Sequence, residues 1–292
     1  MKPAAFDYVR AESVAHAAAA LSDAGGEAKV IAGGQSLMPM MNFRLVKPSV
    51  LVDINAVAGL DTIRVEGGHV RVGALVRHVM TARDPIIARH APIVAQAMKH
   101  VAHLTVRNRG TFCGSVCHAD PVGEMAMMTI LLDGRVHAAS VRGTRTVPAA
   151  EFFVGALATS LEPDEVATAV DLAILPEGTG CGFHEYARRH GDYALAAVAV
   201  LLRRERGRAR DVRVAVMGVG EMPARLPAVE AALEGHEVST GSIAEAVELL
   251  RGAITPGSDL NGSADYRRHL AGALAGRSIR DAWASAREVA RL

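Results

Sequence analysis

The feature that most limits what this chain can fold into is a short apolar strand that runs directly into a pair of glycines. Residues 28–32 read AKVIA, and residues 33–37 read GGQSL. Two successive glycines allow positive φ and a close approach of the backbone to a ligand. Several N–H groups can then converge on a phosphate, with the hydroxyl of Ser36 as a further donor. A tight turn alone would also explain the glycines, because glycine-rich turns are common.

Strand and helix patterns are mixed along the chain without regular alternation. An alanine-rich helix is expected between Ser13, its N-cap, and the glycine pair at residues 25–26, and a strand is expected at residues 50–54. Two adjacent strands are expected at residues 194–205 and 212–220, and two helical segments close the chain. This irregular order favours an α+β fold over a doubly wound sheet.

Composition excludes several classes of protein. The chain has 292 residues, of which half are hydrophobic, and its 32 basic residues nearly balance 31 acidic ones. A net charge of +1 provides no field that would attract nucleic acid or a membrane surface. No apolar run reaches bilayer-spanning length, and the charges and proline near the N-terminus do not fit a secretory signal. We therefore expect a cytoplasmic protein without membrane insertion and without a nucleic-acid partner.

Two of the three cysteines lie in a second glycine-containing segment, residues 107–121 (RNRGTFCGSVCHADP). Cys113, Cys117 and His118 could suggest a zinc or iron–sulfur site. Such a site needs four ligands, usually from two well-separated hooks, and only Cys181 could supply another thiolate. We therefore expect free thiols and no metal site on this chain.

The polar residues of the same segment suggest a different ligand. Hydroxyls and exposed N–H groups at Thr111, Gly114 and Ser115 suit a diphosphate, and the carboxylate of Asp120 suits sugar hydroxyls. Two such segments in one chain can flank a single dinucleotide. Tyr193, which follows a turn, has a ring that could cover a flat cofactor, although core packing is the default for tyrosine.

A third glycine segment, residues 217–225 (MGVGEMPAR), imitates the start of a Rossmann fingerprint. Pro223 occupies the place of the third glycine or alanine, and no strand ending in an acidic residue follows about twenty residues later. We expect a strand that ends in a turn.

The first two segments together resemble a known pair of motifs. Residues 32–45 (AGGQSLMPMMNFRL) and 105–121 (TVRNRGTFCGSVCHADP) are similar to the two FAD-binding segments of the medium, flavin-carrying subunit of the molybdenum hydroxylases. This is the family of carbon monoxide dehydrogenase and bacterial xanthine dehydrogenase. The similarity covers nearly the whole chain, including residues 8–21, 183–200, 218–233 and 263–283.

The resemblance implies an FAD-binding fold of the PCMH type, built from two small α/β subdomains, followed by a C-terminal domain of a small antiparallel sheet plus helices. It places the FAD-binding domain at residues 1–176, with subdomains at about 1–55 and 56–176, and the C-terminal domain at 177–292. A composition shift at residues 175–182 agrees with this boundary.

The resemblance also implies which residues contact the cofactor. The two glycine segments would bind the diphosphate, Glu124 and Asp120 would lie near the FAD sugar, and Tyr193 would lie beside the isoalloxazine ring. The implied residues are Ala32, Gly33, Gly34, Gln35, Ser36, Leu37, Thr111, Cys113, Gly114, Ser115, Asp120, Glu124 and Tyr193.

Cys113 departs from the family pattern, which usually reads TIGGS where this chain has TFCGS. A non-glycine residue forced to positive φ stores about 1–3 kcal/mol of strain. Either the conformation here differs, or the site tolerates the strain. We expect a backbone loop in which neither cysteine is a ligand, and a redox-active thiol beside a flavin stays as a minor alternative.

The implied role is electron transfer inside a complex. FAD on this chain would receive electrons from [2Fe–2S] clusters of a small iron–sulfur subunit, supplied by molybdopterin on a large subunit, and pass them to NAD, a quinone or oxygen. The expected assembly is a dimer of heterotrimers, and no catalytic residue is assigned to this chain. The alternatives are a self-sufficient FAD-dependent oxidase or reductase and a non-catalytic nucleotide-binding regulator.

Overall fold

The computed structural model describes residues 2–288, which form two compact units. The N-terminal unit contains residues 2–87, 103–119 and 133–173. The C-terminal unit contains residues 88–102, 120–132 and 174–288. Each unit therefore contains segments that are interleaved along the chain, and the domain boundary expected at residue 176 stays a prediction.

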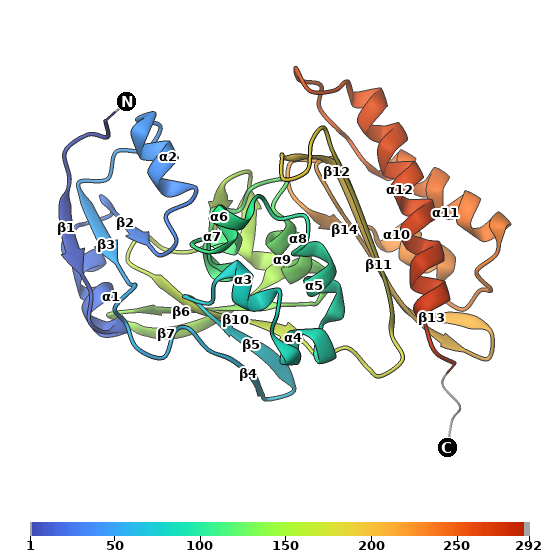
Figure 1. Ribbon diagram of the computed structural model, residues 1–292, viewed down its shortest axis with the longest axis horizontal. Helices are drawn as coiled ribbons and strands as arrows, with labels where there is room; N and C mark the ends of the chain where they lie inside the picture. The colour runs from blue at the N-terminus through green and yellow to red at the C-terminus, as the bar shows by residue number, and fades with distance from the viewer. Residues whose placement is uncertain (1, 289–292) are drawn as a thin grey trace. The chain divides into compact units, whose positions relative to one another are not determined.

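The first part of the N-terminal unit is a three-stranded parallel sheet in the order β1-β3-β2 (Figure 1). Helix α1 begins after Ser13, whose hydroxyl accepts a hydrogen bond from the His16 N–H at 3.1 Å, and it buries Leu21. Such capping of otherwise unpaired N–H groups fixes where a helix begins. The elements are β1 (Asp7–Arg10), α1 (Val14–Asp23), β2 (Ala28–Ile31), α2 (Leu37–Asn42) and β3 (Val50–Asp53).

The second part of the N-terminal unit is a five-stranded antiparallel sheet in the order β4-β5-β10-β6-β7. Alternate residues Val70 and Val72 of β5 are fully buried, as expected for a strand with one face in the core. The strands are β4 (Ile63–Glu66), β5 (His69–Gly73), β6 (Arg135–Ser140), β7 (Gly143–Pro148) and β10 (Val166–Ala173). The remaining elements of the unit are α3 (His78–Thr81), α6 (Leu104–Arg107), α7 (Phe112–His118), α9 (Ala149–Phe152), β8 (Phe153–Gly155) and β9 (Ala158–Thr159).

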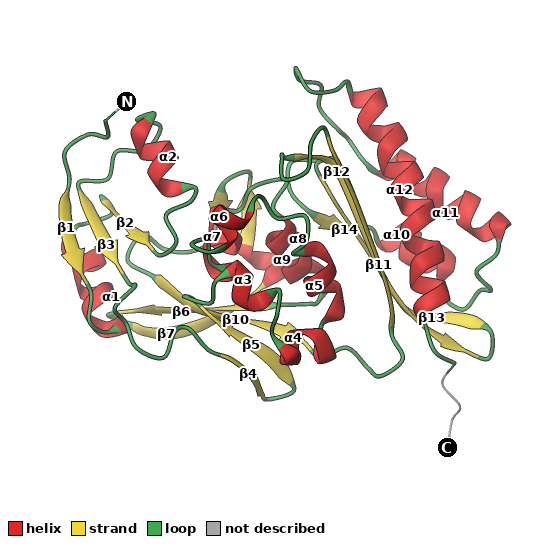
Figure 2. Cartoon of the chain, in the orientation of Figure 1, coloured by secondary structure: helices red, strands yellow, loops and turns green. Residues whose placement is uncertain are grey.

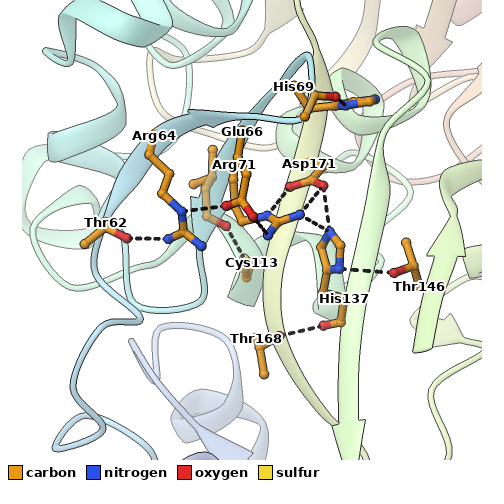
Figure 3. A network of polar contacts seen from close by, with 12 residues as sticks. Thr62, Arg64, Glu66, His69, Arg71, Cys113, His137, Thr146, Thr168 and Asp171 are labelled. Carbon is orange, nitrogen blue, oxygen red and sulfur yellow. Dashed lines mark hydrogen bonds and ion pairs between the residues drawn. The ribbon is translucent and has the colours of Figure 1, made fainter. Parts of the chain in front are cut away.

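A network of polar side chains joins all five strands of this sheet (Figure 3). Asp171 of β10 accepts two hydrogen bonds from Arg71, at 2.6 and 2.8 Å, and lies 2.7 Å from His137 Nε2. Arg71 also contacts Glu66 at 2.9 Å, and Thr146 lies 3.1 Å from the other ring nitrogen of His137. Burial alone would raise the pKa of Asp171, but the hydrogen bonds from Arg71 and His137 hold it below its usual value.

The C-terminal unit is built on an antiparallel sheet in the order β11-β12-β13-β14 (Figure 2). Helix α12 packs closely on β11, because a Cβ at Gly182 would lie 2.0 Å from the Ser278 carbonyl oxygen. The Ser278 hydroxyl donates to Val198 O at 2.9 Å. The strands are β11 (Gly180–Ala187), β12 (Ala194–Glu205), β13 (Arg208–Met217) and β14 (Ala224–Arg225), and the helices are α5 (Pro92–Ala97), α8 (Glu124–Leu131), α10 (Pro227–Leu233), α11 (Thr240–Ala253) and α12 (Ala264–Ser285). Helix α4 (Pro85–His90) spans residues of both units.

The α+β fold class is confirmed, as is the C-terminal antiparallel sheet with helices. The two adjacent strands expected after residue 194 are β12 and β13. One short helix, α10, was not expected between β14 and the two helices that close the chain. Between residues 2 and 288, no helix is both long enough and apolar enough to cross a membrane.

Candidate functional site

The first glycine segment joins the end of β2 to the beginning of α2. Gly34 has φ +72°, a conformation that favours glycine, and Gln35 Nε2 donates to Gly33 O at 3.0 Å. Among the described residues, the backbone N–H groups of residues 33–37 donate to no protein acceptor. Unpaired N–H groups of this kind are able to bind an anion, and phosphate binding by this segment stays a prediction.

The second glycine segment is a short turn followed by a helix, which corrects the expectation of a loop. Thr111 is the N-cap of α7, because its hydroxyl accepts from the Gly114 N–H at 3.0 Å. Cys113 lies inside this helix and has no positive φ. The strain considered for a non-glycine residue at this position is therefore absent. The conformation differs from the one that would require glycine.

The two segments lie against each other. A Cβ added to Gly33 would be 2.4 Å from the carbonyl oxygen of Arg109 and 2.7 Å from the Cα of Gly110. Both neighbours are backbone atoms, so only glycine fits at this position. The structure thus brings together the two segments that the sequence suggested as the sides of one dinucleotide site.

In the second segment Cys113 is buried and Cys117 partly buried, and both thiols are protonated. Cys113 is 2% exposed, and its thiol donates to Val72 O at 3.4 Å. Burial raises the pKa of Cys113 well above its usual value and that of Cys117 to about 12. Thiolates are the form that binds metals, and no group of three or more metal-binding side chains occurs in the described part of the chain.

The C-terminal unit contributes a cluster of three carboxyl groups and a tyrosine. Burial raises the pKa of Glu124 to about 7, with a smaller contribution from the charge of Asp120. Burial, followed by the charge of Glu124, raises the pKa of Glu185 to about 8. Glu185 Oε2 is buried and has no hydrogen-bond partner among the described residues. Near neutral pH this pair of glutamates therefore retains protons that an exposed pair would release.

Tyr193 is an exposed aromatic residue. It is 77% exposed, so the core-packing interpretation of this tyrosine does not hold. Partial burial, followed by the charges of Asp120 and Glu124, raises the pKa of its hydroxyl. The tyrosine and the two carboxyl groups therefore act on one another within the C-terminal unit.

The sequence-predicted residues fall into two groups. The diphosphate candidates from Ala32 to Ser115 all belong to the N-terminal unit, whereas Asp120, Glu124 and Tyr193 belong to the C-terminal unit. Sequence reasoning did not identify Glu185, which lies near the end of β11 beside His184, because nothing in that pattern marks a buried carboxyl group.

The residues present fit a dinucleotide such as FAD. A diphosphate needs hydrogen-bond donors and no nearby negative charge, and neither residues 32–37 nor residues 109–115 include an acidic side chain. The unpaired N–H groups of residues 33–37 supply donors, and the guanidinium groups of Arg77 and Arg109 lie close enough to repel each other.

Comparison with known proteins agrees with this fit. Residues 4–174 match the family described as the FAD binding domain in molybdopterin dehydrogenase, and residues 182–282 match the CO dehydrogenase flavoprotein C-terminal domain. The chain is 42% identical to the nicotine 6-hydroxylase medium subunit of Paenarthrobacter nicotinovorans, over 97% of this chain and 99% of that protein.

Solved structures show the same fold over the whole chain. A carbon monoxide dehydrogenase from Hydrogenophaga pseudoflava that lacks the Mo-pyranopterin moiety of its cofactor has a TM-score of 0.95 at 36% identity, covering 98% of this chain and 100% of that chain. Quinoline 2-oxidoreductase from Pseudomonas putida 86 has a TM-score of 0.93 at 39% identity, covering 98% and 99%. The chain therefore belongs to the family of FAD-binding medium subunits of carbon monoxide dehydrogenase and related molybdenum hydroxylases.

Proposed function

We propose that residues 32–37 and 109–115 bind the diphosphate of FAD, and that Asp120, Glu124 and Tyr193 contact the sugar and the flavin ring. The single observation that supports this assignment best is the run of unpaired N–H groups of residues 33–37, packed through Gly33 against the second segment. On this basis residues 1–176 form the FAD-binding domain and residues 177–292 the C-terminal domain.

The chain's own residues bind and orient the cofactor. Backbone N–H groups of the first segment donate to phosphate oxygens, and the Thr111 cap fixes the beginning of α7 beside them. The exposed ring of Tyr193 is free to cover one face of the flavin. When bound, FAD would supply the redox chemistry that the proposed electron transfer needs.

The proposed role is electron transfer within a cytoplasmic complex. Electrons reach this chain from [2Fe–2S] clusters on a small iron–sulfur subunit, which receives them from molybdopterin on a large subunit, and leave it for NAD, a quinone or oxygen. Two clusters would need eight cysteine ligands, whereas this chain has three cysteines, all buried or partly buried. The assembly is proposed to be a dimer of heterotrimers.

The names of the relatives guide the choice of substrate to test. Nicotine, quinoline and carbon monoxide appear in the names of similar proteins. The purified FAD-loaded chain should keep its oxidised flavin absorbance when each substrate is added anaerobically. Bleaching should require the two partner subunits and the correct substrate.

The opposite result would favour the self-sufficient alternative. Bleaching of the flavin by a substrate in the absence of partner chains would show that this chain contains its own substrate site. Photoreduction of the isolated chain, followed by addition of NAD, a quinone or oxygen, identifies the acceptor independently of the substrate.

A further inference from the structure

Two side chains that lie outside both glycine segments connect the segments to each other. Asn55 Nδ2 donates to Ala32 O at 2.8 Å, and Arg77 Nη1 donates to Arg109 O at 2.5 Å. The two side chains also bind each other, because Arg77 Nη2 donates to Asn55 Oδ1 at 2.6 Å. The result is a continuous bridge from one backbone carbonyl in the first segment to one in the second.

The end of β3 holds this bridge in place. Asp53 Oδ1 accepts from the backbone N–H of Asn55 at 2.8 Å and from its Nδ2 at 2.6 Å. The other carboxylate oxygen accepts from the Tyr8 hydroxyl at 2.5 Å. Burial alone would raise the pKa of Asp53, but the hydrogen bonds from Tyr8 and Asn55 hold it below its usual value, so the carboxylate stays ionised.

The bridge has a direct consequence for the direction of the N–H groups. In a trans peptide unit the C=O and the following N–H point in opposite directions. When Asn55 binds Ala32 O, the N–H of Gly33 must point away from Asn55. Among the described residues this N–H has no protein acceptor. By holding the Ala32 carbonyl group, Asn55 therefore also fixes the direction of the Gly33 N–H, which stays available to a ligand on the side away from Asn55.

The bridge also fixes how closely the segments approach. Arg77 binds the Arg109 carbonyl oxygen, which is the same atom that limits the space at Gly33. Burial, followed by the charge of Arg109, lowers the pKa of Arg77, so two guanidinium groups lie close together at this place. An anion bound beside them reduces their mutual repulsion.

We propose that Asn55 and Arg77 are positioning residues of the FAD site: they bind the Ala32 and Arg109 carbonyl groups and so set the direction of the phosphate-binding N–H groups and the spacing of the two segments. This inference rests on the assignment of the diphosphate to these segments in the proposed function. Neither side chain is required to touch FAD.

The test is a titration of the flavin-free full chain with FAD, followed by flavin fluorescence, for four single variants and one double variant of Asn55 and Arg77. Arg77→Lys keeps the positive charge, but one ammonium group cannot reproduce the planar two-point contact with Arg109 O and Asn55 Oδ1. Asn55→Ala removes the donor to Ala32 O and the acceptor for Arg77 without adding a charge beside Asp53. Arg64→Lys is the matched control, because Arg64 belongs to a different polar network. Gly34→Val tests the segments themselves.

The expected result is an increase in the Kd for FAD of about tenfold or more for Arg77→Lys and Asn55→Ala, with no change for Arg64→Lys. The double variant should be little worse than either single variant, because the two side chains act as one bridge. Thermal unfolding of the flavin-free forms should be nearly unchanged, since Asn55 is exposed and Arg77 half-buried.

The possible failures are distinguishable. If Gly34→Val loses FAD while Arg77→Lys and Asn55→Ala bind it as the wild type does, the bridge is not a positioning device and the site assignment stands. If Gly34→Val also keeps full affinity, the diphosphate does not bind at these segments, and both the proposed site and the bridge are wrong.

Discussion

Replacing Gly33 by alanine is the substitution that tests the site most directly. The added Cβ would lie 2.4 Å from Arg109 O and 2.7 Å from Gly110 Cα. Ordinary contacts begin at 3.4 Å, so the two segments must move apart by about 1 Å. The obstructing atoms belong to the backbone and cannot rotate away as a flexible side chain would.

The size of the effect follows from that displacement. An N–H that donates to a phosphate oxygen at about 2.9 Å loses the hydrogen bond when it is displaced by about 1 Å. A hydrogen bond to a charged group contributes about 1.5–3 kcal/mol, so the loss of one or two such bonds costs about 3 kcal/mol. We therefore expect the Kd for FAD to rise about a hundredfold.

The assay is the same FAD titration of the flavin-free chain, with Gly252→Ala as the control. Gly252 lies in helix α11, has no positive φ, and has no atom within 4 Å of an added Cβ. Its replacement should leave FAD binding unchanged. A Kd for Gly33→Ala within threefold of wild type would show that the tight approach of the segments is not needed for binding, and the reasoning would be refuted.

Three further results are expected. The pKa of Glu185 in the folded chain is about 8, above the 4.5 of an exposed glutamate. Between these two pH values the folded state keeps a proton that the unfolded state releases. The free energy of unfolding therefore falls as the pH rises from about 4.5 to about 8. Glu185→Gln should therefore flatten that decline and raise stability at pH 8 by about 1–3 kcal/mol in denaturant titrations, whereas an unchanged pH profile would contradict the raised pKa. Cys117→Ser should bind FAD like the wild type, and metal analysis of both proteins should find no stoichiometric zinc or iron, because the thiol is partly buried and protonated. Asp171→Asn should destabilise the chain by about 2–4 kcal/mol in chemical unfolding, because Arg71 and His137 lose the charged carboxylate that they share; a loss below about 0.5 kcal/mol would show that the network contributes little.

Much of the fold could be predicted because its signals are local. Ser13 and the alanine run predicted α1, and the apolar runs at β12 and β13 predicted an adjacent pair of strands. The helix after Thr111 was missed, because Gly114 and Ser115 are typical of loops, and the N-cap contact that starts the helix depends on the conformation of Thr111.

The sequence pointed to the candidate site only at its glycines, where the backbone and not a side chain would contact the ligand. Gly33 and Gly34 could be chosen as candidates because few other residues allow their conformation or packing. Asn55 and Arg77 could not be chosen, since their partners lie 23 and 32 residues away in sequence and are carbonyl groups, which every residue has. Glu185 could not be chosen either, because the burial of its Oε2 atom depends on the fold and not on the local sequence.

The interleaving of the C-terminal unit limits how this protein can be divided. Helix α8, which belongs to this unit although it lies before residue 176, packs on β13 and β14 with Met125, Met127 and Met128 fully buried. A fragment that begins at residue 177 would lack this helix and expose the apolar surface that it covers. Such exposed surface promotes aggregation. Residues 88–102 and 120–132 therefore have to accompany residues 174–288 if the C-terminal unit is to keep its core.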